Sequence, residues 1–302
     1  MLKFERILTG SRTLKALIGM GRDEFEDLLA TFSQLLQEHA LSRPRRRALG
    51  GGVKGVLDSP AKKLFFVLFY LKVYPTFDVL GALFAKPRGR SCEAVHLLLP
   101  LLEKTLGRKC VLPVRRIRSV EEFRQRFPEV TDVMIDGVER PIQRPQSGKS
   151  QSRHYSGKKK SHRRKNVVMT DAKRRVLVLT PSKPGRRHDK NLVDRSHLVA
   201  SIPENVGVVV DTGFQGVKHP SLFIPQKATK KRPLSPEAKA GNGYISSQRI
   251  VVEHAIGGMK RYGAMSQVLR NKIGRMDDRV AVVSAGLWNH HLGMQAHTLN
   301  PR

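Results

Sequence analysis

The stretch "TDVMIDGVERPI", residues 131–142, decides the fold of the larger part of the chain. Its apolar run, Val133-Met134-Ile135, predicts a buried strand that ends on the carboxylate of Asp136, with Gly137 directly after it. Asp-Gly is a common turn dipeptide, so this stretch taken alone favours an ordinary strand that enters a turn.

The same pattern recurs further along the chain. "NVGVVVDTG" (205–213) is a second apolar strand that ends on a carboxylate, Asp211, again with a glycine within two residues. Two strands that deliver carboxylates from their C-terminal ends can bring them together at one edge of a sheet. That edge is where ligands usually bind when helices flank the sheet.

The surrounding residues predict an α+β or mixed α/β domain. "KNVVMT" and "RVLVLTP" are strands joined by the turn "DAKR", which predicts an antiparallel hairpin. The segment 188–200 is expected to be a helix, and the chain is expected to be helical again from about 236. Strands and helices in this order indicate a mixed central sheet flanked by helices.

The first third of the chain predicts helices only. Apolar residues recur at helical spacing over 22–40, a basic glycine-rich loop follows at 42–55, and 59–75 is apolar on all sides, with Ser59 as N-cap and Pro60 at the first helical position. Residues 76–107 predict a helix, a basic turn and a second helix that begins at Ser91, with Pro100 kinking or ending its regular part.

Two helices joined by a tight basic turn are typical of a helix-turn-helix, although an ordinary helical pair gives the same pattern. In the helix-turn-helix interpretation the second helix reads the major groove with its first turns. The expected DNA contacts of this motif are Arg88, Arg90, Ser91, Glu93, Ala94 and His96.

The charge of the chain points to a polyanionic partner. The 302 residues carry a formal charge of +31 with a pI of about 10.9, and nucleic acid is the usual partner of such a protein. An anionic membrane is the alternative, but the longest apolar run, "LFFVLFYL", is too short to span a bilayer and has no basic amphipathic face. Cys92 and Cys110 form no CxxC spacing, which argues against a zinc finger and fits a reducing cytosol.

Two carboxylates held close together are costly unless a cation lies between them, and hard oxygen ligands suit Mg²⁺ or Mn²⁺. Glu253 in "RIVVEHAIGGMK" is the candidate third ligand, because Arg249 and Lys260 fall on the same helical stripe. One interpretation is intrahelical pairing on a solvated surface. The other is a metal ligand whose basic neighbours bind phosphates.

Several stretches together carry a family resemblance. "DVMIDGVERPI", "YSGKKKSHRRKNVVMTD", "GRRHDKNL", "VVVDTGFQG" and "RIVVEHAIGGMKR" resemble bacterial insertion-sequence transposases of the DDE type, in particular the insertion-sequence-five family related to Harbinger-like transposases. The helices around "YPTFDVLGALF" resemble the N-terminal domain of the same group, so the likeness covers roughly residues 55–295.

The resemblance implies a ribonuclease H-like catalytic domain at 131–302, preceded by a helix-turn-helix DNA-binding domain at 1–112 and a linker helix at 113–130. It implies Asp136, Asp211 and Glu253 as the catalytic, metal-binding triad, and it maps an Arg-x3-Glu-x6-Lys signature onto Arg249, Glu253 and Lys260. Ser246 departs from the family, which often has Tyr or Asn three residues before this Arg.

The chemistry implied is phosphoryl transfer with two Mg²⁺ or Mn²⁺ ions, Asp136 bridging both and Asp211 and Glu253 each completing one. The expected partners are double-stranded DNA, both terminal inverted repeats and target DNA, and further copies of the chain in a homodimer or higher oligomer. We expect no membrane association and a location in the bacterial cytoplasm, at the nucleoid. The alternative is a domesticated, non-catalytic helix-turn-helix protein that binds a specific DNA sequence.

Residues 140–165 carry ten Lys and Arg and no acidic residue. They are expected either to form a disordered basic loop or to contact phosphates of the transposon end, with binding that weakens steeply with salt. Tyr155 could stack on an unpaired base or pack internally, and Asp189 could stabilise a helix N-terminus or lie near the site. His290 and His291 are expected to be packing or surface residues. The expected phosphate contacts of the basic segment are Lys158, Lys159, Lys160, Arg163, Arg164 and Lys165.

Overall fold

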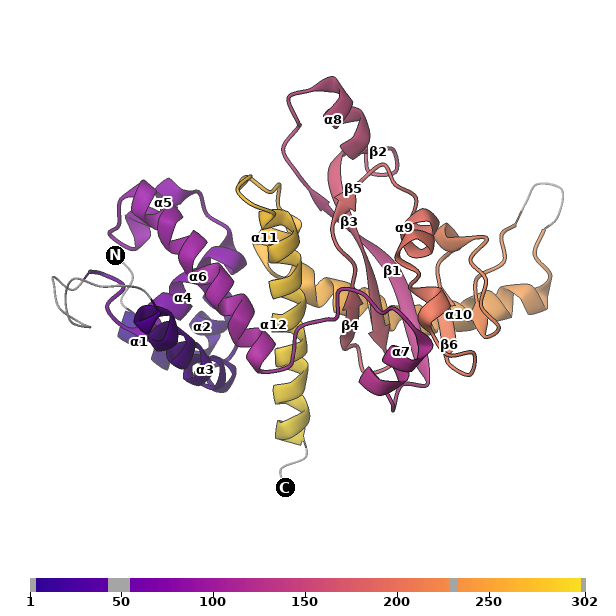
Figure 1. Cartoon of the computed structure of the whole chain (residues 1–302), viewed down its shortest axis with the longest axis horizontal. Coiled ribbons are helices and arrows are strands. Elements are labelled where there is room, and N and C mark those ends of the chain that lie inside the picture. The colour runs from indigo at the N-terminus through magenta and orange to yellow at the C-terminus, as the bar shows by residue number, and fades with distance from the viewer. Residues whose placement is uncertain (1–3, 43–54, 229–232, 300–302) are drawn as a thin grey trace. The chain divides into compact units, whose positions relative to one another are not determined.

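The computed structural model describes residues 4–42, 55–228 and 233–299 (Figure 1). The basic, glycine-rich loop predicted at 42–55 lies almost wholly outside the described residues. The chain forms two compact units. Unit 1 holds the helices up to Leu112 together with 260–267 and the residues from Arg279 on, and unit 2 holds Pro113–Met259 and Val268–Asp278. The functional domain boundaries expected from the sequence stay a prediction.

Unit 1 is entirely helical in its described residues. No helix in the described part of the chain is long and apolar enough to cross a membrane. The helices of unit 1 are α1 (Phe4–Thr9), α2 (Ser11–Ile18), α3 (Arg22–Leu41), α4 (Pro60–Val73), α5 (Phe77–Leu83), α6 (Arg88–Arg108), α11 (Gly263–Ser266) and most of α12 (Met276–Leu299).

Helix α4 is the buried centre of unit 1, as its apolar sequence predicts. Ser59 accepts a hydrogen bond from the backbone N–H of Lys62, and Pro60 opens the helix, so both predicted start signals are confirmed. Residues 64–71 are all buried, and the helix ends at Tyr74 in the left-handed conformation, with φ of 52°.

The pair α5 and α6 differs in detail from the expectation. Helix α6 begins at Arg88 rather than at Ser91, which lies buried in its first turn and is not its cap. Pro100 does not end the helix, which continues to Arg108. The leucines on either side of Pro100 are buried, and their packing offsets the backbone hydrogen bond that proline removes.

Unit 2 combines a mixed sheet with helices, which confirms the expected α+β class. Its helices are α7 (Val120–Arg126), α8 (Gly148–His154), α9 (Asp189–Ser196) and α10 (Pro236–Lys260), with short 3-10 turns η1 (Val199–Ser201) and η2 (Thr212–Phe214). Its strands are β1 (Asp132–Pro141), β2 (Tyr155–Ser156), β3 (Ser161–Asp171), β4 (Val176–Leu179), β5 (Lys183–Pro184), β6 (Gly207–Val210) and β7 (Leu222–Phe223).

The sheet is built around β1. Its main order is β2-β3-β1-β6-β7, and β4 and β5 also pair with β3. Strand β3 is antiparallel to both β1 and β4, which confirms the predicted hairpin, whereas β6 is parallel to β1. Strand β1 is longer than expected, because it stays paired with β3 as far as Pro141 and therefore does not end at Asp136.

One face of the sheet carries the core of unit 2. Val133 and Ile135 of β1 and Val208 and Val210 of β6 lie in one buried cluster with apolar residues of α7 and α9. Because side chains alternate along a strand, Asp136 belongs to the opposite face. Helix α10 contacts that opposite face at Asp136, through Arg249.

Candidate active site

The pairing register of β1 and β6 brings the two predicted catalytic aspartates together. Ile135 lies opposite Val210 in the parallel ladder, so the next residue on each strand is an aspartate, Asp136 on β1 and Asp211 directly after β6. Each carboxylate accepts a hydrogen bond from the backbone N–H of the residue that follows it. Asp136 Oδ1 accepts the backbone N–H of Gly137 at 2.7 Å, and Asp211 Oδ1 accepts that of Thr212 at 2.7 Å.

Helix α10 adds the third carboxylate and a cation. The guanidinium of Arg249 lies 3.6 Å from Asp136 Oδ2, 3.3 Å from Asp211 Oδ1 and 3.7 Å from Glu253 Oε1. All three predicted triad residues therefore meet around one positive charge. Arg249 and Glu253 are one helical turn apart, which lets both reach the same place from one helix face.

The environment of Asp136 makes its carboxyl a weaker acid than usual. Burial raises the pKa of the Asp136 carboxyl above its usual value, and the negative charges of Asp211 and Asp189 act in the same direction. The hydrogen bond from Gly137 and the charge of Arg249 lower the pKa but do not outweigh the burial. A positive charge beside this carboxyl lowers its pKa and so offsets part of the effect of burial.

The three carboxylates have the chemistry of ligands for a divalent cation. Oxygen ligands from carboxylates suit Mg²⁺ and Mn²⁺. Arg249 already places a positive charge among the three carboxylates, so it stands in for the charge that a metal ion would supply. Among the described residues, no three His, Cys, Asp or Glu side chains are close enough to hold a metal ion as they are arranged here.

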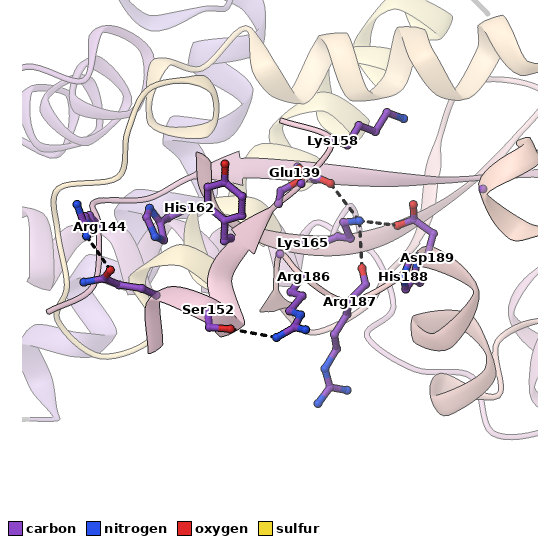
Figure 2. A pocket seen from close by; sticks show the side chains of 16 residues that line it. Glu139, Arg144, Ser152, Lys158, His162, Lys165, Arg186, Arg187, His188 and Asp189 are labelled. Carbon is purple, nitrogen blue, oxygen red and sulfur yellow. Dashed lines mark hydrogen bonds and ion pairs between the residues drawn. The ribbon is translucent and has the colours of Figure 1, made fainter. Parts of the chain in front are cut away.

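A second charged cluster lies against the glycines that follow both aspartates; a place near the site was one of the two alternatives for Asp189, but its pairing with Lys165 was not predicted. A Cβ on Gly137 would lie 2.6 Å from Asp189 Oδ1, and a Cβ on Gly213 would lie 3.6 Å from Asp189 Oδ2. Asp189 is held by the buried Lys165, whose Nζ lies 3.2 Å from Asp189 Oδ1 and 3.0 Å from Glu139 Oε1 (Figure 2). The glycines were the available signal, because glycine marks a close approach of other groups to the backbone.

The predicted phosphate contacts of 140–165 divide into two sets. This segment is structured rather than a continuous loop, since it contains the end of β1, α8, β2 and the start of β3. Lys158, Lys159 and Lys160 are exposed in the turn before β3. The other three lie on β3 with acidic partners: Arg163 with Glu139, Arg164 with Asp277, and Lys165 with Glu139 and Asp189.

The remaining predicted DNA contacts belong to unit 1. Lys260 is exposed as the last residue of α10, two helical turns beyond Glu253. In unit 1, Arg88 and Arg90 are exposed and pair with Asp78 and Glu93, whereas Ser91 is fully buried. His96 is half-buried, and burial lowers its pKa.

Comparison with known proteins agrees with this geometry. The sequence profile of the DDE superfamily endonucleases matches residues 135–289, a range that contains all three carboxylates. The chain is 26% identical over 288 residues to a protein of Microchaete diplosiphon described as a probable transposase for insertion sequence element IS702, covering 95% of this chain and 96% of that relative. No solved structure matches significantly. The chain belongs to the DDE superfamily of endonucleases.

Proposed function

We propose that this protein is an insertion-sequence transposase that binds the terminal inverted repeats of its element and cuts and joins DNA. The observation that carries the proposal is the convergence of Asp136, Asp211 and Glu253 around Arg249, within a chain of formal charge +31. Family membership implies DNA as the substrate, and the name of the relative supports transposition. Assignment to the insertion-sequence-five group is part of the same proposal.

The proposed reaction is phosphoryl transfer in two steps. Water attacks the phosphodiester at the end of the element, which breaks the P–O3′ bond and leaves a 3′-hydroxyl on the element and a 5′-phosphate on the flanking DNA. That 3′-hydroxyl then attacks a phosphodiester of the target DNA, joins to its 5′-phosphate and displaces the 3′-hydroxyl of the target strand. Divalent metal ions, proposed to be two Mg²⁺ or Mn²⁺, supply the activation of the attacking oxygen and the stabilisation of the leaving oxygen. A covalent protein–DNA intermediate is not required.

The residues of the chain have separate parts in this proposal. Asp136, Asp211 and Glu253 would hold the metal ions, and the backbone N–H groups of Gly137 and Thr212 fix the two aspartates in place. Arg249 balances the carboxylates before a metal binds and is then available to a DNA phosphate, with Lys260 further along the helix. The pairing of two inverted repeats is proposed to need at least a dimer.

The arrangement of unit 2 supports the proposal that its fold is ribonuclease H-like. Two parallel neighbours, β1 and β6, carry the aspartates, and β3 extends the sheet antiparallel on the other side of β1. The pair α5 and α6 is proposed to serve as the helix-turn-helix. The exposed Arg88 and Arg90 support this, while Ser91, being buried, would contribute by packing.

The test is cleavage of DNA that carries the ends of the element, in Mg²⁺. We expect Asp136→Ala, Asp211→Ala and Glu253→Ala to lose cleavage by at least about a hundredfold while binding of the inverted repeat persists. Asp132→Ala is the matched control, because it removes an exposed carboxylate from the same strand, and it should cleave normally. Cleavage retained by all three triad variants would refute the proposal, and an inactive wild type that still binds would favour the non-catalytic DNA-binding alternative.

A further inference from the structure

A pocket of about 940 Å³ lies in unit 2, and Figure 2 shows the side chains that line it. Its walls come from the end of β1, from α8, β2 and β3, and from the segment before α9. The proposed function assigns no role to this pocket. Its volume is at the upper end of the range of roughly 300–1,000 Å³ that is usual for small-molecule sites, so it has room for a nucleotide or two rather than for a duplex.

The pocket and the proposed catalytic carboxylates are connected past the end of β6. Asp189 and Gly213 line the pocket, and Asp189 packs against Gly137, the neighbour of Asp136. Strand β6 ends at Val210, whereas β1 continues to Pro141, so no strand covers that side of β1 beyond Ile135 in the described structure. Strand alternation places the pocket residue Glu139 on the face opposite Asp136. A polymer that passes from one site to the other must therefore go around a sheet edge.

The pocket has an excess of positive charge. Five cations line it, against the carboxylates of Glu139 and Asp189, and Lys165 at its floor is already paired with both acids. Arg144 and Arg186 donate hydrogen bonds to uncharged side chains, Gln151 and Ser152. The cations that have no acidic partner among the described residues are Arg144, Lys158, Arg186 and Arg187.

An aromatic side chain lies among these cations. Tyr155 is 44% exposed although it lines the pocket, and its ring meets the ring of His162 edge to face, with centroids 5.7 Å apart. Residues Tyr155 and His162 are directly opposite each other in the β2–β3 ladder, which fixes the position of the tyrosine. An exposed aromatic ring in a cationic groove is the arrangement that stacks unpaired bases and holds their phosphates.

We infer that this pocket binds unpaired nucleotides of the DNA strand next to the phosphodiester that the carboxylates cut. A base offers its face to a side chain only when it has left the duplex stack. A single strand can also follow the path around the end of β6, since it is narrow and flexible. This inference rests on the proposed function and adds a binding site for the strand beside the cleavage point.

The test compares two fluorescent DNA probes of the same duplex sequence, one blunt and one with a three-nucleotide single-stranded overhang, bound to the full chain in EDTA. We expect the wild type to bind the overhang probe about tenfold more tightly, because an unpaired base that stacks on an aromatic ring adds to the affinity whatever its sequence. Tyr155→Ala should lose this preference while keeping its affinity for the blunt probe within about twofold. Tyr155→Phe should keep the preference, since the ring remains.

Tyr244→Ala is the matched control, because Tyr244 is a 65% exposed tyrosine on α10 that does not line the pocket. It should retain the full preference. Equal binding of the two probes by the wild type, or an undiminished preference in Tyr155→Ala, would overturn the inference and leave the cleavage proposal standing. Failure to bind either probe would overturn both.

Discussion

The glycine after Asp136 provides the sharpest test of how the site is packed. A Cβ introduced by Gly137→Ala would lie 2.6 Å from Asp189 Oδ1 and 3.1 Å from its Cγ, whereas ordinary contact begins near 3.4 Å. The carboxylate must therefore retreat by most of an ångström. That oxygen is the one that Lys165 Nζ approaches at 3.2 Å, so the retreat loosens a buried ion pair.

We expect Gly137→Ala to lower the free energy of unfolding by about 1–2 kcal/mol, the size usual for overpacking at a site that can partly adjust. Urea denaturation of the purified chain measures the change. Gly243→Ala is the control, because a Cβ at Gly243 meets nothing within 4 Å and the position is an exposed one in α10. It should be neutral or stabilise the protein by up to about 1 kcal/mol, since alanine favours the helix.

A double-mutant cycle separates this cause from general damage to β1. Asp189→Ala removes the oxygen that the new Cβ would meet, so in that background Gly137→Ala should cost clearly less than in the wild type, with a coupling of at least about 0.5 kcal/mol. Equal costs of Gly137→Ala in the two backgrounds would refute the reasoning. So would a Gly137→Ala variant as stable as Gly243→Ala.

Three further perturbations test other parts of the charge network. Arg249→Gln should lower stability in EDTA by about 1–2 kcal/mol, and added Mg²⁺ should raise the melting temperature of the variant more than that of the wild type, because the carboxylates lose their balancing charge. Arg140→Met should lower the free energy of unfolding, measured in urea, by about 2–4 kcal/mol. Arg140 is 2% exposed and donates a hydrogen bond to Asn166, and it remains charged although burial lowers its pKa to about 10. Burial raises the pKa of Glu24, but the hydrogen bond from His291 and nearby positive charges outweigh it, so the pKa is lower in the folded protein than in the unfolded chain. The free energy of unfolding should therefore fall as the pH drops below about 4.3, and it should fall less steeply in Glu24→Gln.

Each of these expectations has a result that would contradict it. An Arg249→Gln variant that gains no more from Mg²⁺ than the wild type would mean that Arg249 does not balance the triad. An Arg140→Met variant as stable in urea as the wild type would mean that an apolar side chain replaces the buried guanidinium without loss of stability. Identical acid profiles of Glu24→Gln and the wild type would mean that the Glu24–His291 contact adds nothing to stability.

Much of the fold could be predicted because local periodicity carries it. The apolar face of α3, the N-cap of α4, the β3–β4 hairpin and the strand before Asp211 all follow from spacings of two or 3.6 residues and from turn residues. The helical spacing of four residues likewise predicts that Arg249 and Glu253 lie on one face of α10. These features depend on neighbours in sequence, which a single chain displays directly.

What the sequence did not predict depends on contacts between distant residues. The packing alternative for His290 and His291 is confirmed, because both lie buried on α12. Their hydrogen-bond partners on α3, Asp27 and Glu24, were not predicted. The mainly apolar middle of α12 indicates burial but does not say which helices bury it. The place of Arg249 among the carboxylates depends in the same way on the approach of α10 to the sheet.

The basic segment shows why composition alone overstates DNA contacts. Ten cations in 140–165 look alike in sequence, but β3 begins at Ser161 and turns three of the last cations toward acids of unit 2. Lys165 forms ion pairs with both Glu139 and Asp189. It can therefore affect the substrate only indirectly, by holding Asp189 in place. Charge patterning predicts the partner of a protein better than it predicts which cations touch that partner.

The core and the active site of unit 2 are set by the same register. The apolar side chains on one face of the two paired strands are buried: Val133 and Ile135 of β1, and Val208 and Val210 of β6. The same pairing places the next residue of each strand, Asp136 and Asp211, side by side. A slip of one residue in β6 would turn its valines away from the core and move Asp211 to the wrong face at the same time. The apolar burial that stabilises β1 against β6 therefore also holds two like charges together. The charge of Arg249, and of a metal ion when one is bound, then offsets the repulsion that this packing imposes.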